Sequence, residues 1–226
     1  MRVYEPDAAP LAIQGPKAID VGAVLFGEDV RNMRPFAFRE MALEGIPLVL
    51  ARSGWSKQGS FELYLTDSSC ESDFWALVKA AGAPWGIGPG APNDVERIES
   101  GLISYGADMR WQTHPADPFE MGLGRFVDLD GYMISSTGRP SPRGGRGRSR
   151  VGVFVASDGV PGIVQPRPLI LGERRVGTVS EIVRSRRLDR AIGIAMVETD
   201  AMSGDLWVSV ADGRRAVTGT ELPFIR

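Results

Sequence analysis

A stretch without apolar periodicity divides this sequence and constrains its fold more than any other feature. Residues 137–150 read TGRPSPRGGRGRSR and contain five arginines. This composition is typical of a flexible loop or linker, because it offers no surface that a core could bury. We therefore place a boundary near residue 130 and predict three parts: 1–130, an Arg/Gly-rich linker over 131–150, and a C-terminal part over 151–226.

The first part interleaves short apolar runs with helical periodicities, which favours an α+β fold. The predicted strands cover 9–15, 36–43, 46–51 and 61–65, and the predicted helices cover 16–27, 72–82 and 94–101. Glu44-Gly45 joins two of these strands and predicts a tight hairpin turn. Pro47 argues against regular pairing there, since it lacks one ladder donor.

Beyond the linker the sequence alternates short β-like runs with turns. The runs cover 151–156, 169–171, 176–179, 191–197 and 206–210. Strands of this length and spacing are typical of a small β-barrel or a β-sandwich. We therefore predict an all-β C-terminal domain.

The overall charge and the single cysteine restrict the partners and the compartment. A net charge of −2 gives no reason to expect nucleic acid, and no apolar run approaches the roughly 20 residues that span a bilayer. The Arg/Gly run could bind RNA, but a connector is the favoured interpretation in a slightly acidic chain. Cys70 alone cannot form an intrachain disulfide, and the N-terminus carries Glu5 and Asp7 instead of a secretory signal. We expect a cytoplasmic protein without nucleic-acid or membrane partners.

One carboxylate lies in the middle of an apolar strand. In the run 61–65, FELYL, Glu62 shares a face with Tyr64, and the three apolar residues share the other. The preceding loop contains two glycines and two serines, and Trp55 lies at its tip. A carboxylate beside aromatic surface and such a loop could bind a planar heterocycle with N–H donors. A solvated strand residue is the alternative, because isolated charges usually face water.

A second polar cluster surrounds the helix predicted at 94–101. Asn93 could cap that helix or face a ligand. For Arg97, a structural ion pair with Glu96, with Glu99 or with a carboxylate elsewhere in the chain is the favoured role. The one histidine, His114, excludes a metal site with more than one imidazole, and we predict no metal ligands.

Five segments, taken together and in this order, resemble one known family. They are LAIQGPK at 11–17, RSGWSKQGSFELY at 52–64, RIESGLISYGAD at 97–108, PFEMGLGRFVD at 118–128 and LPFI at 222–225. Each is similar to a motif of the glycine-cleavage T protein, or aminomethyltransferase, family. Within that family, WSKQG at 55–59 and PNDVERIESG at 92–101 look most like the dimethylsulfoniopropionate demethylases.

The resemblance implies a folate-binding aminomethyltransferase-like portion followed by a small C-terminal β-barrel, with tetrahydrofolate as the cofactor. Carried over by position, Glu62, Tyr64 and Asn93 are expected to bind folate, and Trp55 is expected to bind a small-molecule methyl donor. The implied activity moves a methyl group from a small sulfonium, such as dimethylsulfoniopropionate, to N5 of tetrahydrofolate. No residue is assigned a catalytic role.

Two departures from the family pattern open alternatives. Asn93 stands where T proteins usually carry a folate-contacting arginine, which favours the demethylase subgroup. The family's chain begins well before the segment 11–17, so the resemblance implies that the N-terminal portion is lacking. A separate partner chain that supplies this portion is one expectation. A truncated, non-catalytic folate-binding module is the second, and an aminomethyltransferase acting on a lipoyl carrier protein is the third.

Overall fold

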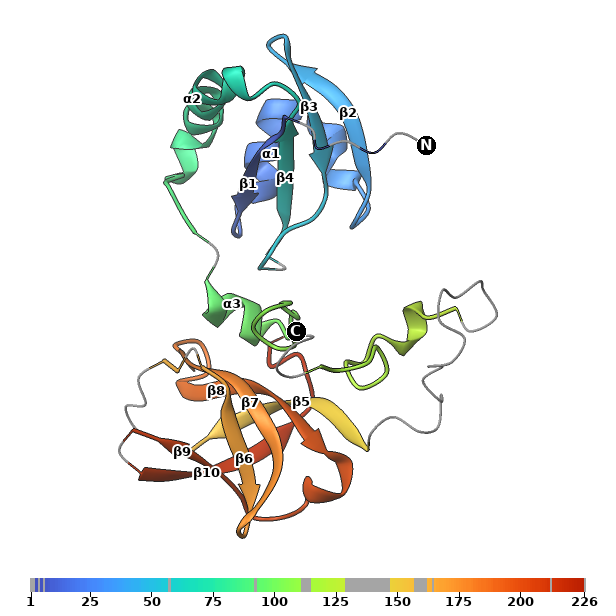
Figure 1. Ribbon diagram of the computed structural model, residues 1–226. Coiled ribbons are helices and arrows are strands. Elements are labelled where there is room, and N and C mark those ends of the chain that lie inside the picture. Colours follow the sequence, from blue (N-terminus) through green and yellow to red (C-terminus); the bar gives the residue numbers. More distant parts are fainter. Residues whose placement is uncertain are drawn as a thin grey trace. The chain divides into compact units, whose positions relative to one another are not determined.

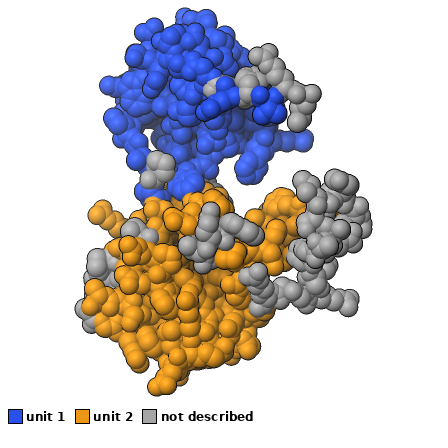
Figure 2. Space-filling model, in the orientation of Figure 1, with its two compact units in different colours: residues 1–93 blue, residues 94–226 orange. Residues whose placement is uncertain are grey.

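The computed structural model describes residues 3, 5, 7–56, 58–91, 93–110, 115–128, 147–156, 162–163, 165–211 and 213–225. The chain forms two compact units, unit 1 over Met1–Asn93 and unit 2 over Asp94–Arg226 (Figures 1 and 2). Both helices and strands are present, and the α+β class is confirmed. Among the described residues, no helix combines the length and the apolar character that crossing a membrane requires.

Unit 1 is built on a four-stranded antiparallel sheet with the strand order β1-β4-β3-β2 (Figure 1). Its strands are β1 (Ala9–Gln14), β2 (Phe38–Leu43), β3 (Ile46–Ala51) and β4 (Ser60–Leu65). Its helices are α1 (Ala18–Phe26) and α2 (Glu71–Gly82), with short 3-10 turns at η1 (Glu28–Asn32), η2 (Ser68–Cys70) and η3 (Ala83–Trp85). The four strands and two helices predicted for this stretch are confirmed.

The β2–β3 hairpin turns at Glu44 and Gly45, as the sequence predicts. Both residues have positive φ, 49° and 82°, which matches a type I′ turn. Pro47 is accommodated because it lies at the start of β3, opposite Thr66, which follows the end of β4. The Thr66 amide donates to the Pro47 carbonyl at 3.3 Å. The donor that proline lacks therefore falls at the end of the ladder.

Strand alternation gives the sheet an apolar inner face and an open outer face. The inner face is buried together with α1 and α2, and this core includes Ile13, Leu48, Leu50, Phe61, Leu63, Val21, Phe74 and Val78. Gly22 lets α1 pack closely on β4, since a Cβ at Gly22 would lie 2.4 Å from Phe61 Cε2. On the outer face, one row across the four strands consists of Ala12, Glu62, Ala51 and Phe38.

Unit 2 contains a closed β-barrel with the strand order β10-β5-β8-β7-β6-β9, so of the two predicted β architectures the barrel is the one observed (Figure 1). Its strands are β5 (Arg148–Val155), β6 (Arg167–Leu171), β7 (Arg174–Ser185), β8 (Arg190–Glu198), β9 (Leu206–Val210) and β10 (Gly213–Thr220). The helix α3 (Asp94–Glu99) and the turns η4 (Gly124–Phe126) and η5 (Thr199–Ala201) complete the unit. Its interior is apolar, with Val153, Leu169, Val179, Ala195 and Val208 fully buried.

The barrel departs most from the sequence prediction at three strands. β7 continues six residues beyond the predicted end at 179, because Ser180 and Glu181 are buried polar residues that interrupt the apolar run but not the strand. β10 was not predicted, since GRRAVTGT contains too few apolar residues to indicate a strand. β5 begins at Arg148, so the last three residues of the predicted linker belong to the barrel.

Of the rest of the predicted linker, 131–146 lies outside the described residues, and Gly147 directly precedes β5. Residues 94–128, which the prediction assigns to the first domain, group with the barrel in unit 2. The division into 1–130, 131–150 and 151–226 therefore stays a prediction.

A buried charge cluster in unit 2 centres on Arg97. The Arg97 side chain is fully buried, and its guanidinium donates to Asp108 Oδ2 at 2.6 Å, to Asp94 Oδ1 at 3.0 Å and to Glu181. It also donates to the Leu102 carbonyl at 3.0 Å. The ion pairing favoured for Arg97 is therefore confirmed, and its partners come from α3, from a turn and from β7.

Further donors satisfy Asp108, whereas Glu181 depends mainly on Arg97. Asp108 accepts the Ser104 amide at 2.9 Å and the Ser180 hydroxyl at 2.6 Å. Burial, followed by the negative charge of Asp94, raises the pKa of Glu181 above its ordinary value, and Arg97 opposes this rise. The positive charge of Arg97 is thus what favours the ionised form of Glu181 inside the barrel wall.

We predict that Arg97→Met lowers the free energy of unfolding by about 3–5 kcal/mol at neutral pH, because it leaves two buried carboxylates without their cation. Without Arg97, the folded-state pKa of Glu181 rises further above its unfolded value, because burial and Asp94 raise it and the opposing cation is gone. Stability is then lost as the pH increases, so the deficit relative to the parent chain grows from acidic to neutral pH. Urea unfolding at pH 5 and pH 7.5 measures both effects.

The control is Arg31→Met, which removes an exposed arginine that pairs with Asp20 and Glu28. It should leave the urea midpoint nearly unchanged at both pH values, because exposed ion pairs contribute little. Equal deficits of Arg97→Met at pH 5 and pH 7.5 would contradict the prediction.

Candidate functional site

The outer face of the unit 1 sheet presents Glu62 at its centre. Glu62 is half-buried on β4, and its cross-strand neighbours are Ala12 on β1 and Ala51 on β3. Because both neighbours are alanines, no long side chain stands beside the carboxylate within this row. The predicted alternation is confirmed, with Tyr64 on the same face and Phe61 and Leu63 on the buried one. The carboxylate is therefore flanked on both neighbouring strands by small side chains.

Two hydroxyl donors hold one oxygen of this carboxylate. The Ser53 hydroxyl donates to Glu62 Oε2, and the Tyr64 hydroxyl donates to the same oxygen at 3.3 Å. Burial, followed by the negative charge of Glu62, raises the pKa of the Tyr64 hydroxyl, which therefore stays protonated at neutral pH. Within the described part of the chain, neither Ser53 nor Tyr64 nor any other donor reaches Oε1. Among the described residues, the two donors to the carboxylate therefore both lie at Oε2.

The loop between β3 and β4 brings Trp55 into the neighbourhood of Glu62. Ser53, two residues before Trp55, makes the bond to the carboxylate, so loop and strand are directly connected. Arg52 donates from Nη1 to the Ser60 carbonyl at 2.6 Å and lies over the Phe61 ring, with Cζ 4.9 Å from its centroid. The Trp55 side chain is partly buried, and its indole Nε1 has no acceptor among the described residues.

Two exposed aromatic side chains lie at the start of β2, the strand at the end of the Glu62 row. Phe38, at the end of the Glu62 row, is 70% exposed, and Phe36, just before β2, is 88% exposed. Phe36 also adopts φ 64°, and a left-handed conformation costs a residue with a Cβ roughly 1–2 kcal/mol. Two large apolar side chains this exposed and this near in sequence are candidates for an interaction site. Sequence reasoning missed Phe36 and Phe38, because a strand pattern does not reveal which face stays uncovered.

The other predicted candidates are distributed as follows. Asn93 is an exposed residue directly before α3, and its role toward folate stays a prediction. Cys70 is a half-buried free thiol at the end of η2. His114 lies outside the described residues, and the described residues contain no group of three or more side chains that could hold a metal ion.

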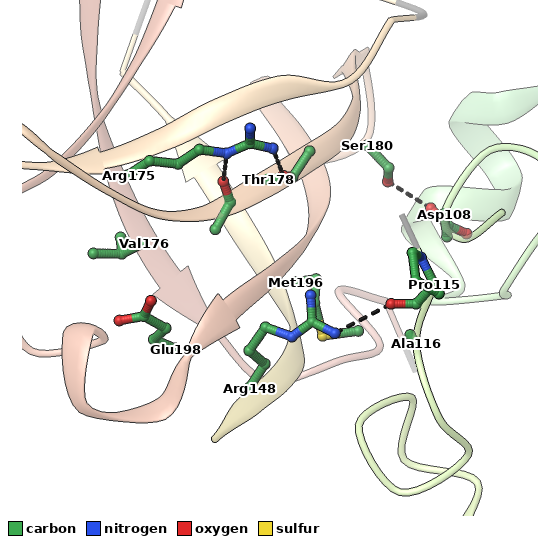
Figure 3. A pocket seen from close by; sticks show the side chains of 11 residues that line it. Asp108, Pro115, Ala116, Arg148, Arg175, Val176, Thr178, Ser180, Met196 and Glu198 are labelled. Atoms are coloured by element: carbon green, nitrogen blue, oxygen red, sulfur yellow. Dashed lines mark hydrogen bonds between the residues drawn. The ribbon is translucent and has the colours of Figure 1, made fainter. Parts of the chain in front are cut away.

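A separate cavity of about 250 Å³ lies in unit 2 (Figure 3). Its polar side chains bind one another: Ser180 donates to Asp108, Arg148 donates to the Pro115 carbonyl at 3.1 Å, and Arg175 donates to Thr178 Oγ1 at 2.8 Å. Arg148 is also paired with Glu120 at 2.9 Å. None of Glu62, Tyr64, Trp55 and Asn93 is among the described residues that line this cavity.

Family comparisons match both parts of the chain. A model of the GCVT N-terminal domain matches residues 1–131, and a model of the glycine cleavage T-protein C-terminal barrel domain matches residues 148–225. The chain therefore belongs to the glycine cleavage T-protein family, as its motifs indicate, and the predicted C-terminal barrel is confirmed.

Individual relatives agree with this assignment. The chain is 38% identical over 224 residues to dimethylsulfoniopropionate demethylase DmdA from Ruegeria pomeroyi, covering 98% of this chain and 60% of the relative. It is 27% identical to an aminomethyltransferase from Bacillus cereus strain B4264, of which it covers 59%. The crystal structure of glycine cleavage system aminomethyltransferase T from Bartonella henselae matches 97% of this chain and 60% of its own, with a TM-score of 0.72 and 20% identity. The chain thus spans about three fifths of the length of these relatives and shares their fold.

We predict that Glu62→Gln lowers the pKa of Tyr64 toward its ordinary value, because it removes the negative charge that disfavours the phenolate. The contribution of burial stays, so the return is partial. Ultraviolet absorbance titration of the phenolates measures the shift, and a Tyr64→Phe titration identifies the signal among four tyrosines. Glu40→Gln, an exposed substitution on β2 of the same sheet, is the matched control and should leave the Tyr64 titration unchanged.

Proposed function

We propose that this chain carries the folate-binding and methyl-donor-binding parts of a tetrahydrofolate-dependent methyltransferase that demethylates a small sulfonium such as dimethylsulfoniopropionate. The observation that supports it best is the Glu62 carboxylate, which Ser53 and Tyr64 hold through Oε2, while no donor from the described residues reaches Oε1. The similarity to a dimethylsulfoniopropionate demethylase at 38% identity favours a sulfonium as the methyl donor.

Glu62 is suited to bind the pterin ring of folate. A carboxylate accepts two parallel N–H donors in a bidentate arrangement, which gives both affinity and orientation. The Tyr64 bond to Oε2 is long at 3.3 Å, so it is the bond that a ring donor would replace at that oxygen. Ala12 and Ala51 leave room for a planar ring beside the carboxylate. The residues of this face therefore fit a pterin, and Asn93 is proposed as a further folate contact.

Trp55 is suited to bind the methyl donor. An indole face attracts a sulfonium cation by a cation–π contact worth about 2 kcal/mol when water is excluded. When bound, tetrahydrofolate supplies N5 as the nucleophile for the methyl group. The task of the protein is then to align two ligands and to exclude water, because a sulfonium is already a good leaving group. Glu62 on β4 and Trp55 in the loop that precedes this strand serve that alignment.

We further propose that polypeptide equivalent to the rest of the longer relatives covers the outer face of the unit 1 sheet, in the same chain or as a separate one. The chain spans 60% of the demethylase relative, and Phe36 and Phe38 are exposed beside Glu62. If this cover is absent, folate binding without turnover is the expected behaviour. Aminomethyl transfer from a lipoyl carrier protein is the second candidate, supported by relatives at 27% identity.

We predict that the chain binds tetrahydrofolate and that Glu62→Gln weakens this binding roughly ten- to hundredfold, because hydrogen bonds to a charged group contribute about 1.5–3 kcal/mol. Isothermal titration calorimetry measures the change. Glu40→Gln is again the control and should bind as the parent does. Equal affinity of the parent chain and Glu62→Gln for tetrahydrofolate would show that Glu62 does not bind this ligand.

Turnover is tested separately, with dimethylsulfoniopropionate and tetrahydrofolate, for the chain alone and with the remaining segment of a demethylase relative added. Methyl transfer in either mixture supports the methyltransferase. Folate binding with no transfer in either mixture supports the non-catalytic module, and transfer that requires a lipoyl carrier protein supports the aminomethyltransferase.

A further inference from the structure

We propose that Gln14 is a positioning residue that sets Trp55 at a defined place relative to Glu62, and this inference rests on the proposed function. Gln14 is the last residue of β1, and its side-chain Oε1 accepts two consecutive backbone amides: Trp55 N–H at 2.9 Å and Ser56 N–H at 3.1 Å. A carbonyl oxygen has two lone pairs, so this one oxygen is fully used. Gln14 thus fixes the backbone at the residue proposed to bind the methyl donor.

The loop reaches Gln14 only because of a close approach at Gly54. A Cβ at Gly54 would lie 1.9 Å from the Ser60 hydroxyl oxygen and 2.4 Å from Ser60 Cβ. Ser60 is the first residue of β4 and pairs with Gln14 across the sheet. Gly54 therefore allows the loop to pass directly over this pair, where the glutamine amide can bind the next two residues.

Successive loop residues are thus attached to two adjacent strands. Ser53 donates to Glu62 on β4, Gly54 packs on Ser60, and Trp55 is bound to Gln14 on β1. The β1–β4 pairing fixes the separation of Gln14 from Glu62, because Gln14 is opposite Ser60 and Ala12 is opposite Glu62. The separation of the Glu62 carboxylate from the Trp55 backbone is therefore set by strand register.

The indole itself does not provide this anchoring. Its Nε1 is buried and has no acceptor among the described residues, so no hydrogen bond within that part of the chain orients the ring. The orientation of Trp55 then depends on its backbone, which Gln14 holds. Loss of the glutamine acceptor should therefore affect the methyl-donor site and leave the Glu62 carboxylate in place.

Two substitutions of Gln14 distinguish the effect of its hydrogen-bond acceptor from the effect of its side-chain size. Gln14→Met keeps the length and removes the acceptor, and Gln14→Glu keeps an acceptor for both amides. Hydrogen exchange at the Trp55 and Ser56 amides should be roughly three- to tenfold faster in Gln14→Met and close to the parent rate in Gln14→Glu. Gly54→Ala, which displaces the loop from Ser60, should also accelerate exchange. Unchanged exchange in Gln14→Met would overturn the proposal.

A second experiment compares the effect of Gln14→Met on the methyl donor with its effect on tetrahydrofolate. In the mixture that supports methyl transfer, Gln14→Met should raise the KM for dimethylsulfoniopropionate several-fold and leave the Kd for tetrahydrofolate unchanged. If Gln14→Met weakened the binding of both ligands equally, Gln14 would have only a structural role, and the positioning role would be overturned. If neither mixture transfers a methyl group, the proposed function fails, and the amide exchange still decides whether Gln14 holds the loop.

Discussion

The buried guanidinium of Arg97 is the interaction on which unit 2 depends. It joins α3, the turn at Asp108 and strand β7 through contacts to three carboxylates, two of which are buried. Removing such charges from water is costly, so this pairing adds little net stability. It is instead what allows the carboxylates of α3, the Asp108 turn and β7 to pack together. Once Glu181 is enclosed in the barrel wall, its only compensating cation among the described residues is Arg97. The short helix and the barrel therefore form as one unit.

Unit 1 depends instead on the small size of particular side chains. Gly22 allows α1 to approach Phe61, and Gly54 allows the β3–β4 loop to lie on Ser60. Alanines flank Glu62 on both neighbouring strands. One face of the sheet is thus packed closely against helices. The other face carries Glu62, with only small side chains beside it on the neighbouring strands. The contrast between the two faces places the candidate site where ligand access is possible.

Sequence reasoning recovers what depends on local pattern. The Glu44-Gly45 hairpin and the face shared by Glu62 and Tyr64 follow from turn chemistry and alternation, and both are observed. It fails where distant residues decide the structure. β7 extends through Glu181 only because Arg97, 84 residues earlier, neutralises the buried carboxylate. The contact of Gln14 with Trp55, across 41 residues, has no local signal either, since glutamine at the end of a strand is usually solvated.

The two alanines beside Glu62 also bear on how selectivity could change within such a scaffold. A carboxylate accepts any ligand that offers a matching pair of N–H donors, so it discriminates poorly between ring systems. Which ring shapes fit beside the carboxylate then depends on Ala12 and Ala51, the smallest side chains of the row. A branched residue at either position would narrow the space beside Glu62, while the carboxylate and its donors stayed the same. In this architecture, the evolution of new ligand preferences can proceed through residues that make no polar contact at all.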